Sequence, residues 1–261
     1  MNRSTFLTAF IAAFVAAIVS VAVIQFSPKA PKNTIPQGSE ASAYVKQALL
    51  NDPLMLDEVF VALQASRQQQ ELAQAKVAIK SATPAIYSDS RDAVLGSKTP
   101  TFTLVEFFDY NCGYCKMAAK WTQTLLEQNP DTVQIIFKDF PVLEGRAEGS
   151  KESSVAAMAL WLQGPEIFQK YHFSMMEAEG GFDSQRIDEF AKNAGADVEL
   201  MRSVMQSEQA NFDAHIADTM TLARSLNIDG TPAFIANNQL VHGANIEYLQ
   251  ELFRQSQSII D

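Results

Sequence analysis

The segment FFDYNCGYCK, residues 107–116, contains both cysteines of the 261-residue chain. Cys112 and Cys115 are separated by two residues, and they follow directly after the apolar run of residues 102–108. Two cysteines cannot provide a disulfide framework for a chain of this length, and they supply only half of the ligands of a zinc site. The pair is therefore a structural remnant, half of a shared metal site or a redox pair, and the rest of the sequence must distinguish these.

The composition is that of a globular protein with a complete core. Hydrophobic residues make up 47% of the chain, and the length is sufficient for one or two domains. The formal net charge is −10 at pH 7, and no basic block occurs anywhere, so we expect no nucleic-acid partner. The acidity favours solubility, and we predict no cation site or acidic substrate from it.

Residues 1–26 have the features of an export segment. No charged residue occurs between Arg3 and Lys29, and residues 6–26 read FLTAFIAAFVAAIVSVAVIQF. This run is about as long as a membrane-spanning helix, and it exceeds the usual apolar region of a cleaved signal. Cleavage after Ala22 is also compatible with the sequence, so a membrane anchor and a cleaved signal both stay open. In either case the remainder is exported to an oxidising compartment, where disulfide chemistry is expected.

A linker and a helical segment follow the export segment. Residues 27–38, SPKAPKNTIPQG, contain three prolines and no periodic apolar face, which is typical of a linker. Residues 39–83 repeat apolar side chains at helical spacing, with a break at residues 51–53 where Pro53 opens a second helix. The second helix is long and rich in Gln, with a narrow apolar seam. We therefore predict that residues 39–83 form an oligomerisation segment.

From residue 84 onward the pattern alternates between strands and helices. The expected elements are a buried strand at 101–109, a helix at 112–128, a strand at 133–140, helices within about 148–227, a hairpin at 233–242 and a last helix at 245–260. The first three form a strand–helix–strand unit with a parallel pair of strands. The order predicts an α/β protein with a thioredoxin-like fold, a helical insertion and an N-terminal helical segment.

The position of the cysteines at a strand-to-helix junction favours reactivity. Cys112 is expected at the helix N-cap, where unpaired N–H groups and the positive end of the helix dipole stabilise a thiolate. Cys115 lies one turn later, faces Cys112 and is shielded from solvent by the helix. Cys112 can therefore attack a substrate disulfide, and Cys115 can resolve the mixed disulfide that results.

The other interpretations of the cysteine pair have less support. A structural disulfide across so short a loop adds little to stability. The three histidines, His172, His215 and His242, are isolated and show no ligand spacing. We therefore predict no metal site, and no cofactor other than the redox-active disulfide between Cys112 and Cys115.

Two motifs give the chain a resemblance to the DsbA-like family of thiol-disulfide oxidoreductases. They are residues 107–116 and the stretch Gly-Thr-Pro-Ala-Phe at 230–234, and the resemblance covers about residues 84–261. Within the family the sequence is most similar to the ScsC-like members, which add N-terminal helices that oligomerise. The resemblance implies a DsbA-type catalytic domain at 84–261, a cis peptide bond between Thr231 and Pro232, and a proline loop packed against the cysteines and open to a substrate strand.

The resemblance also implies an acid–base residue, Glu106, six positions before Cys112. It matches the buried acid of the family, which relays a proton to or from the resolving thiol. A lone carboxylate in an apolar strand is costly unless it is paired or functional. A Glu106 that faces water at the strand end is the alternative. Lys138, on the neighbouring strand, is a candidate ion partner of Glu106 or a solvated surface lysine.

Gly113 and Tyr114, between the cysteines, are expected to tune the redox potential. In this superfamily the Gly-Tyr pair, together with Thr before the cis-proline, also occurs in DsbC-type disulfide isomerases, whereas strong oxidants usually carry Pro-His and Val. The resemblance thus implies an enzyme that forms or reshuffles disulfide bonds in exported client proteins, with isomerase activity.

The implied setting is the periplasm, with the protein either soluble after signal cleavage or tethered to the inner membrane by residues 6–26. Its expected partners are cysteine-containing clients, a membrane redox partner and further copies of the chain, as a homodimer or homotrimer through residues 39–83. Two alternatives stay open. One is a soft-metal, copper-handling protein with thiolates shared between chains, and the other is a reductase kept reduced by a membrane partner.

Overall fold

The computed structural model describes residues 39–52 and 54–258. The predicted export segment and linker lie outside the described residues. The chain divides into two units, with the boundary between Gln64 and Ala65. In residues 39–52 and 54–258, no helix combines the length and the apolar character needed to cross a bilayer.

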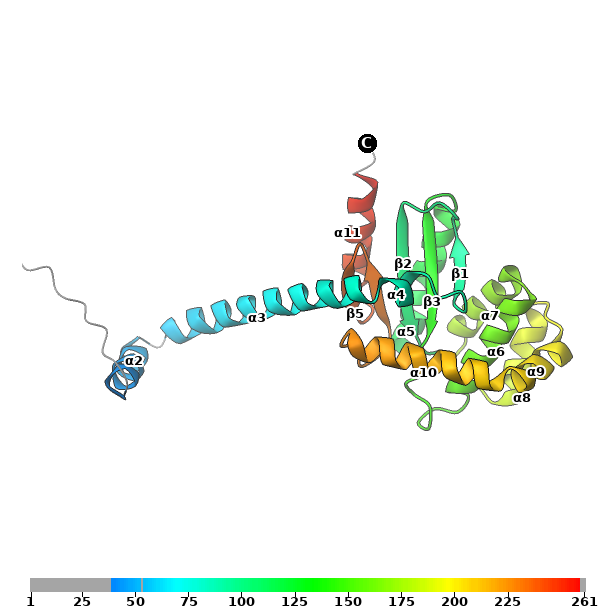
Figure 1. Cartoon of the computed structure of the whole chain (residues 1–261), viewed down its shortest axis with the longest axis horizontal. Coiled ribbons are helices and arrows are strands. Elements are labelled where there is room, and N and C mark those ends of the chain that lie inside the picture. The colour runs from blue at the N-terminus through cyan, green and yellow to red at the C-terminus, as the bar shows by residue number, and fades with distance from the viewer. Residues whose placement is uncertain (1–38, 53, 259–261) are drawn as a thin grey trace, which may run out of the picture. The chain divides into compact units, whose positions relative to one another are not determined.

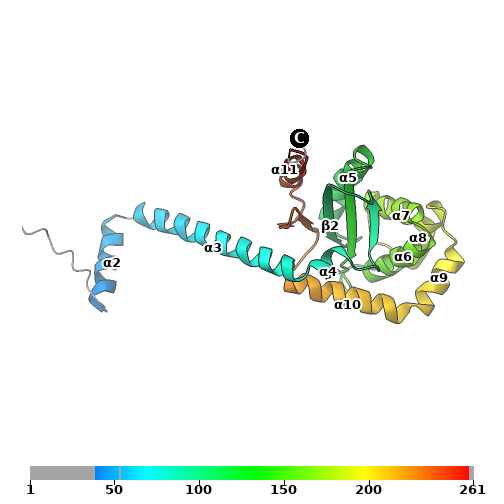
Figure 2. The ribbon, with the colours of Figure 1, turned by 45° about the horizontal axis from the view of Figure 1, so that its top comes forward.

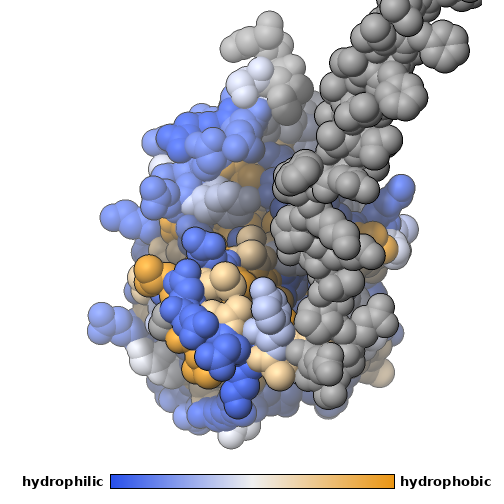
Figure 3. All heavy atoms as spheres, turned by 90° about the vertical axis from the view of Figure 1, so that its left-hand side faces the viewer, coloured by the Kyte–Doolittle hydropathy of each residue, from blue (hydrophilic) through white to orange (hydrophobic). Residues whose placement is uncertain are grey.

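The first unit contains helix α2 (Ser39–Asn51) and the beginning of helix α3 (Leu54–Ser81). The break between the helices lies where the sequence places it, at residues 51–53. The apolar side chains of these helices are largely exposed to solvent: Tyr44, Val45, Leu50, Leu54, Met55, Leu56, Val59, Phe60, Val61 and Leu63. Figure 3 shows one face of the molecule, on which hydrophobic side chains are exposed among hydrophilic ones.

The second unit is built on a five-stranded sheet with the order β1-β3-β2-β4-β5. The strands are β1 (Ala93–Gly96), β2 (Phe102–Phe108), β3 (Val133–Asp139), β4 (Ala233–Ala236) and β5 (Gln239–His242). β2 and β3 are parallel and the other neighbours are antiparallel (Figure 1). Helix α5 (Gly113–Gln128) connects β2 to β3. The predicted strand–helix–strand unit and the thioredoxin-like fold are therefore confirmed.

The hairpin between β4 and β5 turns through Asn237 and Asn238. Both residues have positive φ, 49° and 57°. Two consecutive residues in this region make a type I′ turn, whose twist matches that of the flanking strands, and Asn tolerates it better than most residues. The Asn237 side chain also donates a 2.8 Å hydrogen bond to the Leu252 carbonyl oxygen. The contact joins the hairpin to the C-terminal helix α11 (Ile246–Gln257).

The helical insertion lies between β3 and β4. It consists of α6 (Ser150–Gln163), α7 (Pro165–Glu177), α8 (Ser184–Asn193), α9 (Val198–Ser207) and α10 (Gln209–Ser225). Two of these helices begin with an aspartate cap. The Asp183 carboxylate accepts a 2.8 Å hydrogen bond from the Arg186 N–H, and Asp197 accepts one of 2.9 Å from Leu200.

Two hydrophobic cores cover the two faces of the sheet. One contains Leu104 and Phe108 of β2 together with buried residues of α5, α11 and helices α6 to α9. The other contains Val105 and Phe107 of β2 with residues of α10, of the end of α3 and of the short helix α4 (Thr83–Tyr87). Figure 2 shows α10 and α4 along one side of the sheet. Successive residues of β2 thus alternate between the two cores.

This alternation places Glu106 and Lys138 on opposite faces of the sheet. Lys138 is the register partner of Phe107, whereas Glu106 is the register partner of Phe137. The prediction that Lys138 is the ion partner of Glu106 is therefore wrong, because directly paired residues share a face and adjacent residues do not. Lys138 is buried, so the alternative of a solvated surface lysine is also wrong.

Lys138 instead belongs to a buried polar group on the second face. Its ammonium forms a salt bridge with Asp92 and donates a 2.6 Å hydrogen bond to the Ala85 carbonyl oxygen of α4. The His215 Nε2 of α10 lies 3.2 Å from the other oxygen of Asp92. The group joins α4, the entry to β1, β3 and α10.

Replacing Asp92 with Asn should strongly destabilise the protein. The change leaves the Lys138 ammonium buried without its counter-ion, which costs about 3–5 kcal/mol in comparable buried pairs. Urea unfolding measures the loss. Asp213→Asn is the matched control, since Asp213 pairs with Lys151 at the surface at 2.9 Å and should contribute less than about 1 kcal/mol. Equal losses in the two variants would contradict the importance of the buried pair.

Candidate active site

The cysteine motif occupies the turn from β2 into α5. Cys112 is the N-cap of α5, in an extended conformation with φ −80° and ψ 116°. Its N–H donates a 3.0 Å hydrogen bond to the Asp109 carbonyl oxygen, and its own carbonyl oxygen accepts one of 3.1 Å from the Lys116 N–H. The predicted N-cap position of Cys112 is confirmed.

The surroundings of Cys112 favour its thiolate. The pKa of Cys112 is lowered to about 6, first by the hydrogen bond from the Cys115 thiol and then by bonds from the Thr231 side chain and the N–H groups of Cys115 and Tyr114. Burial of the thiol opposes these effects. A large fraction of Cys112 is therefore ionised at neutral pH, which makes it the better nucleophile of the pair.

Cys115 has the opposite environment. It is completely buried, and burial raises its pKa well above the usual range, with the adjacent Cys112 adding to the rise. Both cysteines are free thiols in this structure. Both thiols are buried, Cys112 with 8% of its surface exposed and Cys115 with none, and they differ mainly in acidity. Cys112 can therefore attack as a thiolate while Cys115 stays protonated behind it.

The Thr231–Pro232 loop lies beside Cys112. The peptide bond between Thr231 and Pro232 is cis, as the resemblance implies. The Cys112 Sγ donates a 3.2 Å hydrogen bond to the Thr231 carbonyl oxygen, across 119 positions of sequence. Pro232 is buried, and its carbonyl oxygen accepts a 2.8 Å hydrogen bond from the Gly243 N–H, which ties the loop to the end of β5.

Glu106 is buried in the core on the same face as α5. Its side chain is 1% exposed, and neither carboxylate oxygen has a hydrogen-bond partner among the described residues. Burial raises the pKa of Glu106 to about 8. Its charge also raises the pKa of Cys115. The alternative of a water-facing Glu106 is therefore wrong, and the carboxyl can exchange a proton near neutral pH.

Gly113 and Tyr114 are both exposed at the start of α5. Tyr114 is 65% exposed, and a Cβ added at Gly113 would meet no atom within 4 Å. Neither side-chain position is constrained by packing inside the chain. Their contribution at the site comes from the Tyr114 N–H and from the surface that they present around Cys112.

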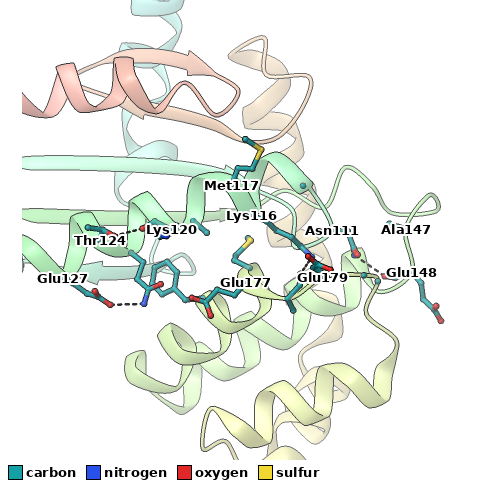
Figure 4. A pocket seen from close by; sticks show the side chains of 18 residues that line it. Asn111, Lys116, Met117, Lys120, Thr124, Glu127, Ala147, Glu148, Glu177 and Glu179 are labelled. Carbon is teal, nitrogen blue, oxygen red and sulfur yellow. Dashed lines mark hydrogen bonds between the residues drawn. The ribbon is translucent and has the colours of Figure 1, made fainter.

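A cavity of about 960 Å³ opens beside the motif, between α5 and the segment that follows α7. Figure 4 shows Asn111, Lys116 and Met117 on its α5 side, with Glu177 and Glu179 across from them. The Lys116 ammonium donates a 2.6 Å hydrogen bond to the Ala178 carbonyl oxygen. Asp109, Asn111 and Lys116 all lie within residues 107–116, but no pattern in the sequence indicates the contacts that they make.

The described residues hold no group of three or more His, Cys, Asp or Glu side chains that is arranged to bind a metal ion. The copper-handling alternative would therefore need ligands from a second copy of the chain.

Replacing Glu106 with Gln should change how stability depends on pH. The pKa of Glu106 rises from 4.5 to about 8 on folding, so the folded state holds the proton across this window and loses stability as pH rises through it. Between pH 4.5 and 8.5 the variant should gain about 3–5 kcal/mol relative to the native chain. Urea unfolding at the two pH values tests this, with the exposed Glu148→Gln as control. Identical pH dependence in all three proteins would contradict the assignment.

Comparisons with known proteins agree with this geometry. A linker-deletion mutant of ScsC from Proteus mirabilis is 25% identical, with a TM-score of 0.60, and the match covers 88% of this chain and 99% of that one. A thioredoxin-like oxidoreductase from Silicibacter pomeroyi DSS-3 is 31% identical, with a TM-score of 0.60, over 67% of this chain and 97% of that one. Disulfide bond formation protein D from Bacillus subtilis (strain 168) is 23% identical over 57% of this chain and 68% of its own length.

The chain spans 24% of the length of the Na(+)/H(+) antiporters from Salinispora that are also similar to it. The model of the DSBA-like thioredoxin domain matches residues 103–253, which include both cysteines, Glu106 and the Thr231–Pro232 loop. This match extends over more than half of the sequence. The chain therefore belongs to the family of DSBA-like thioredoxin domains.

Proposed function

We propose that this chain is an exported thiol-disulfide oxidoreductase that forms or reshuffles disulfide bonds in folding proteins, with isomerase activity. The observation that carries the proposal is the asymmetry of the two thiols. Cys112 has a pKa of about 6 at the N-cap of α5, and Cys115 is buried behind it with a raised pKa. Such a pair can capture a substrate sulfur and then release it.

In the isomerase reaction the Cys112 thiolate attacks one sulfur of a client disulfide. The client disulfide breaks, one client sulfur leaves as a thiolate, and a mixed disulfide forms with Cys112. A different client thiolate then attacks the mixed disulfide, forms a new client disulfide and releases the Cys112 thiolate. The chain is neither oxidised nor reduced over this cycle.

The mixed disulfide can also be resolved within the chain, when the Cys115 sulfur attacks the Cys112 sulfur. A disulfide forms between them, two electrons pass to the client, and the client leaves reduced. The reverse sequence oxidises a client dithiol. Cys115 must lose its proton before it attacks, and we assign Glu106 as the acceptor because its pKa of about 8 allows proton exchange near neutrality.

The Thr231–Pro232 loop is assigned to client binding. Thr231 lies against the Cys112 sulfur, and β4 begins immediately after Pro232. An extended client segment that pairs with the backbone of this loop would bring its own sulfur to Cys112. Gly113 and Tyr114 form the exposed surface on the other side of the sulfur.

The proposed isomerase activity depends on oligomerisation through residues 39–83. Isomerisation requires several active sites around one misfolded client, and oligomerisation hinders reoxidation by a membrane oxidase. The exposed apolar side chains of α2 and α3 support association, because a soluble monomer rarely exposes so many together. A hollow of about 530 Å³ lined by Val45, Leu49, Leu50 and Leu56 offers a place for an apolar side chain of another copy.

Export places the proposed reaction in the periplasm. The apolar residues 6–26 would direct the chain there, as a cleaved signal or as an inner-membrane tether. The clients are exported proteins that contain cysteine. A membrane oxidoreductase would exchange two electrons with the cysteine pair, and its direction decides whether the chain acts as an oxidant or as a reductase.

Cys112→Ala should abolish the reshuffling of scrambled ribonuclease, because no other accessible thiolate remains. Cys115→Ala should instead accumulate mixed disulfides with clients, since the resolving thiol is missing. Non-reducing electrophoresis after acid quenching detects these adducts. A Cys112→Ala protein that still reshuffles ribonuclease would refute the mechanism.

Shortening the chain tests the role of the N-terminal helices. A version that begins at Ala65 should be a monomer that retains dithiol oxidation and loses isomerisation, while a version that begins at Ser39 should remain oligomeric. The cut at residue 65 keeps Ile79, which is buried against the second core. Light scattering gives the masses, and a monomeric Ser39 version would defeat the oligomer proposal.

A further inference from the structure

We propose that Asp109 is a positioning residue of the redox site, whose carboxylate holds the Cys112 turn against the first loop of the helical insertion. The inference rests on the proposed redox role of Cys112. It concerns a residue that neither cysteine chemistry nor the proton exchange of Glu106 uses.

The Asp109 carboxylate is fully buried and accepts three hydrogen bonds. Its Oδ1 accepts a 2.8 Å bond from the Asn111 N–H, inside the turn that leads to Cys112. Its Oδ2 accepts a 2.9 Å bond from the Leu143 N–H and a 2.7 Å bond from the Ser150 Oγ–H. One oxygen thus binds the cysteine turn, and the other binds the segment that opens the insertion.

Further contacts close the same turn. The Asp109 carbonyl oxygen accepts the Cys112 N–H, and the Asn111 side-chain amide donates a 3.2 Å hydrogen bond to the Glu148 carbonyl oxygen. Ser150 is the first residue of α6. The turn before Cys112 is therefore held by three residues of the 143–150 segment, and Asp109 makes two of these three contacts.

Only a carboxylate satisfies this arrangement. Each oxygen faces a backbone N–H, from Asn111 on one side and from Leu143 on the other. An asparagine side chain has a single accepting oxygen, so its NH₂ group would face one of these donors in either orientation. That backbone N–H would be left buried without an acceptor, and the turn would have to move to relieve it.

Movement of the turn should affect the thiolate. The N–H groups of Tyr114 and Cys115 lower the pKa of Cys112, so they act only while α5 begins in its present orientation under the sulfur. Two other titratable groups lie next to the sulfurs: Glu106 on β2, whose charge adds to the raised pKa of Cys115, and Lys116 on α5, whose pKa is lowered by burial and raised in part by the charge of Asp109.

The sign of the effect separates positioning from charge. Removal of a negative carboxylate near Cys112 would by itself favour the thiolate and lower the pKa of Cys112. Loss of the helix N-terminal donors would raise this pKa. A rise in Asp109→Asn therefore reports on geometry.

The experiment follows the rate of iodoacetamide alkylation of the reduced full-length chain against pH. In Asp109→Asn the midpoint for Cys112 should rise by about one unit, equivalent to a tenfold loss of thiolate at low pH. Ser150→Ala keeps the carboxylate and two of its three donors, so its midpoint should rise by about half a unit. The glutathione equilibrium should shift toward the disulfide form in the same order.

Leu252→Ala is the stability control. Leu252 is buried on α11 beside Asn237, at the end of β4 away from Pro232, so its truncation should reduce stability and leave the alkylation midpoint unchanged. An unchanged or lower midpoint in Asp109→Asn, or an equal rise in Leu252→Ala, would overturn the proposal. If Asp109→Asn does not fold, Ser150→Ala decides the question. If the alkylation midpoint of Cys112 in the native chain equals the usual pKa of a free cysteine, the proposed function itself is refuted.

Discussion

The site depends on the placement of one sulfur at the beginning of a helix. Cys112 caps α5, so its sulfur receives N–H groups that no intrahelical carbonyl can use, and the Thr231 loop meets it from the far end of the sequence. The hydrogen bond from the Cys115 thiol is the largest cause of the lowered pKa of Cys112, and together with the Thr231 side chain and the N–H groups of Cys115 and Tyr114 it outweighs burial, so this pKa falls to about 6. The same helix buries Cys115 one turn later and raises its pKa. The beginning of α5 therefore carries both a nucleophilic thiolate, Cys112, and a thiol that stays protonated, Cys115.

The sheet separates the chemistry from a structural polar group. Glu106 points into the core beneath α5, where burial raises its pKa and its charge acts on Cys115. Lys138 points into the other core, where Asp92 and the Ala85 carbonyl oxygen satisfy its ammonium. An isolated carboxyl suits proton exchange because protonation is the only way to neutralise it. A paired ammonium suits stability because its charge is already compensated.

The contiguous motifs of the sequence predict most of the fold and of the site. The sequence predicts the strands β2 and β3, the helix α5 and the hairpin of β4 and β5 close to where the structure has them. These features depend on neighbours within a few residues, so they can be recognised from the sequence alone. The prediction that Glu106 pairs with Lys138 is wrong because such a pair depends on the register between β2 and β3. Lys138 aligns with Phe107, and an offset of a single residue directs its side chain to the other face.

The sequence by itself determined that two thiols lie at a strand-to-helix junction, with a Thr-Pro element available to approach them, because both features are local patterns of residues. Only the tertiary structure decided what surrounds each charged group. Asp109 meets Leu143 and Ser150, and Lys138 meets Asp92, through contacts between segments more than 30 positions apart. Such contacts are set by the packing of the helical insertion and of α10 on the sheet, and no spacing along the chain encodes them.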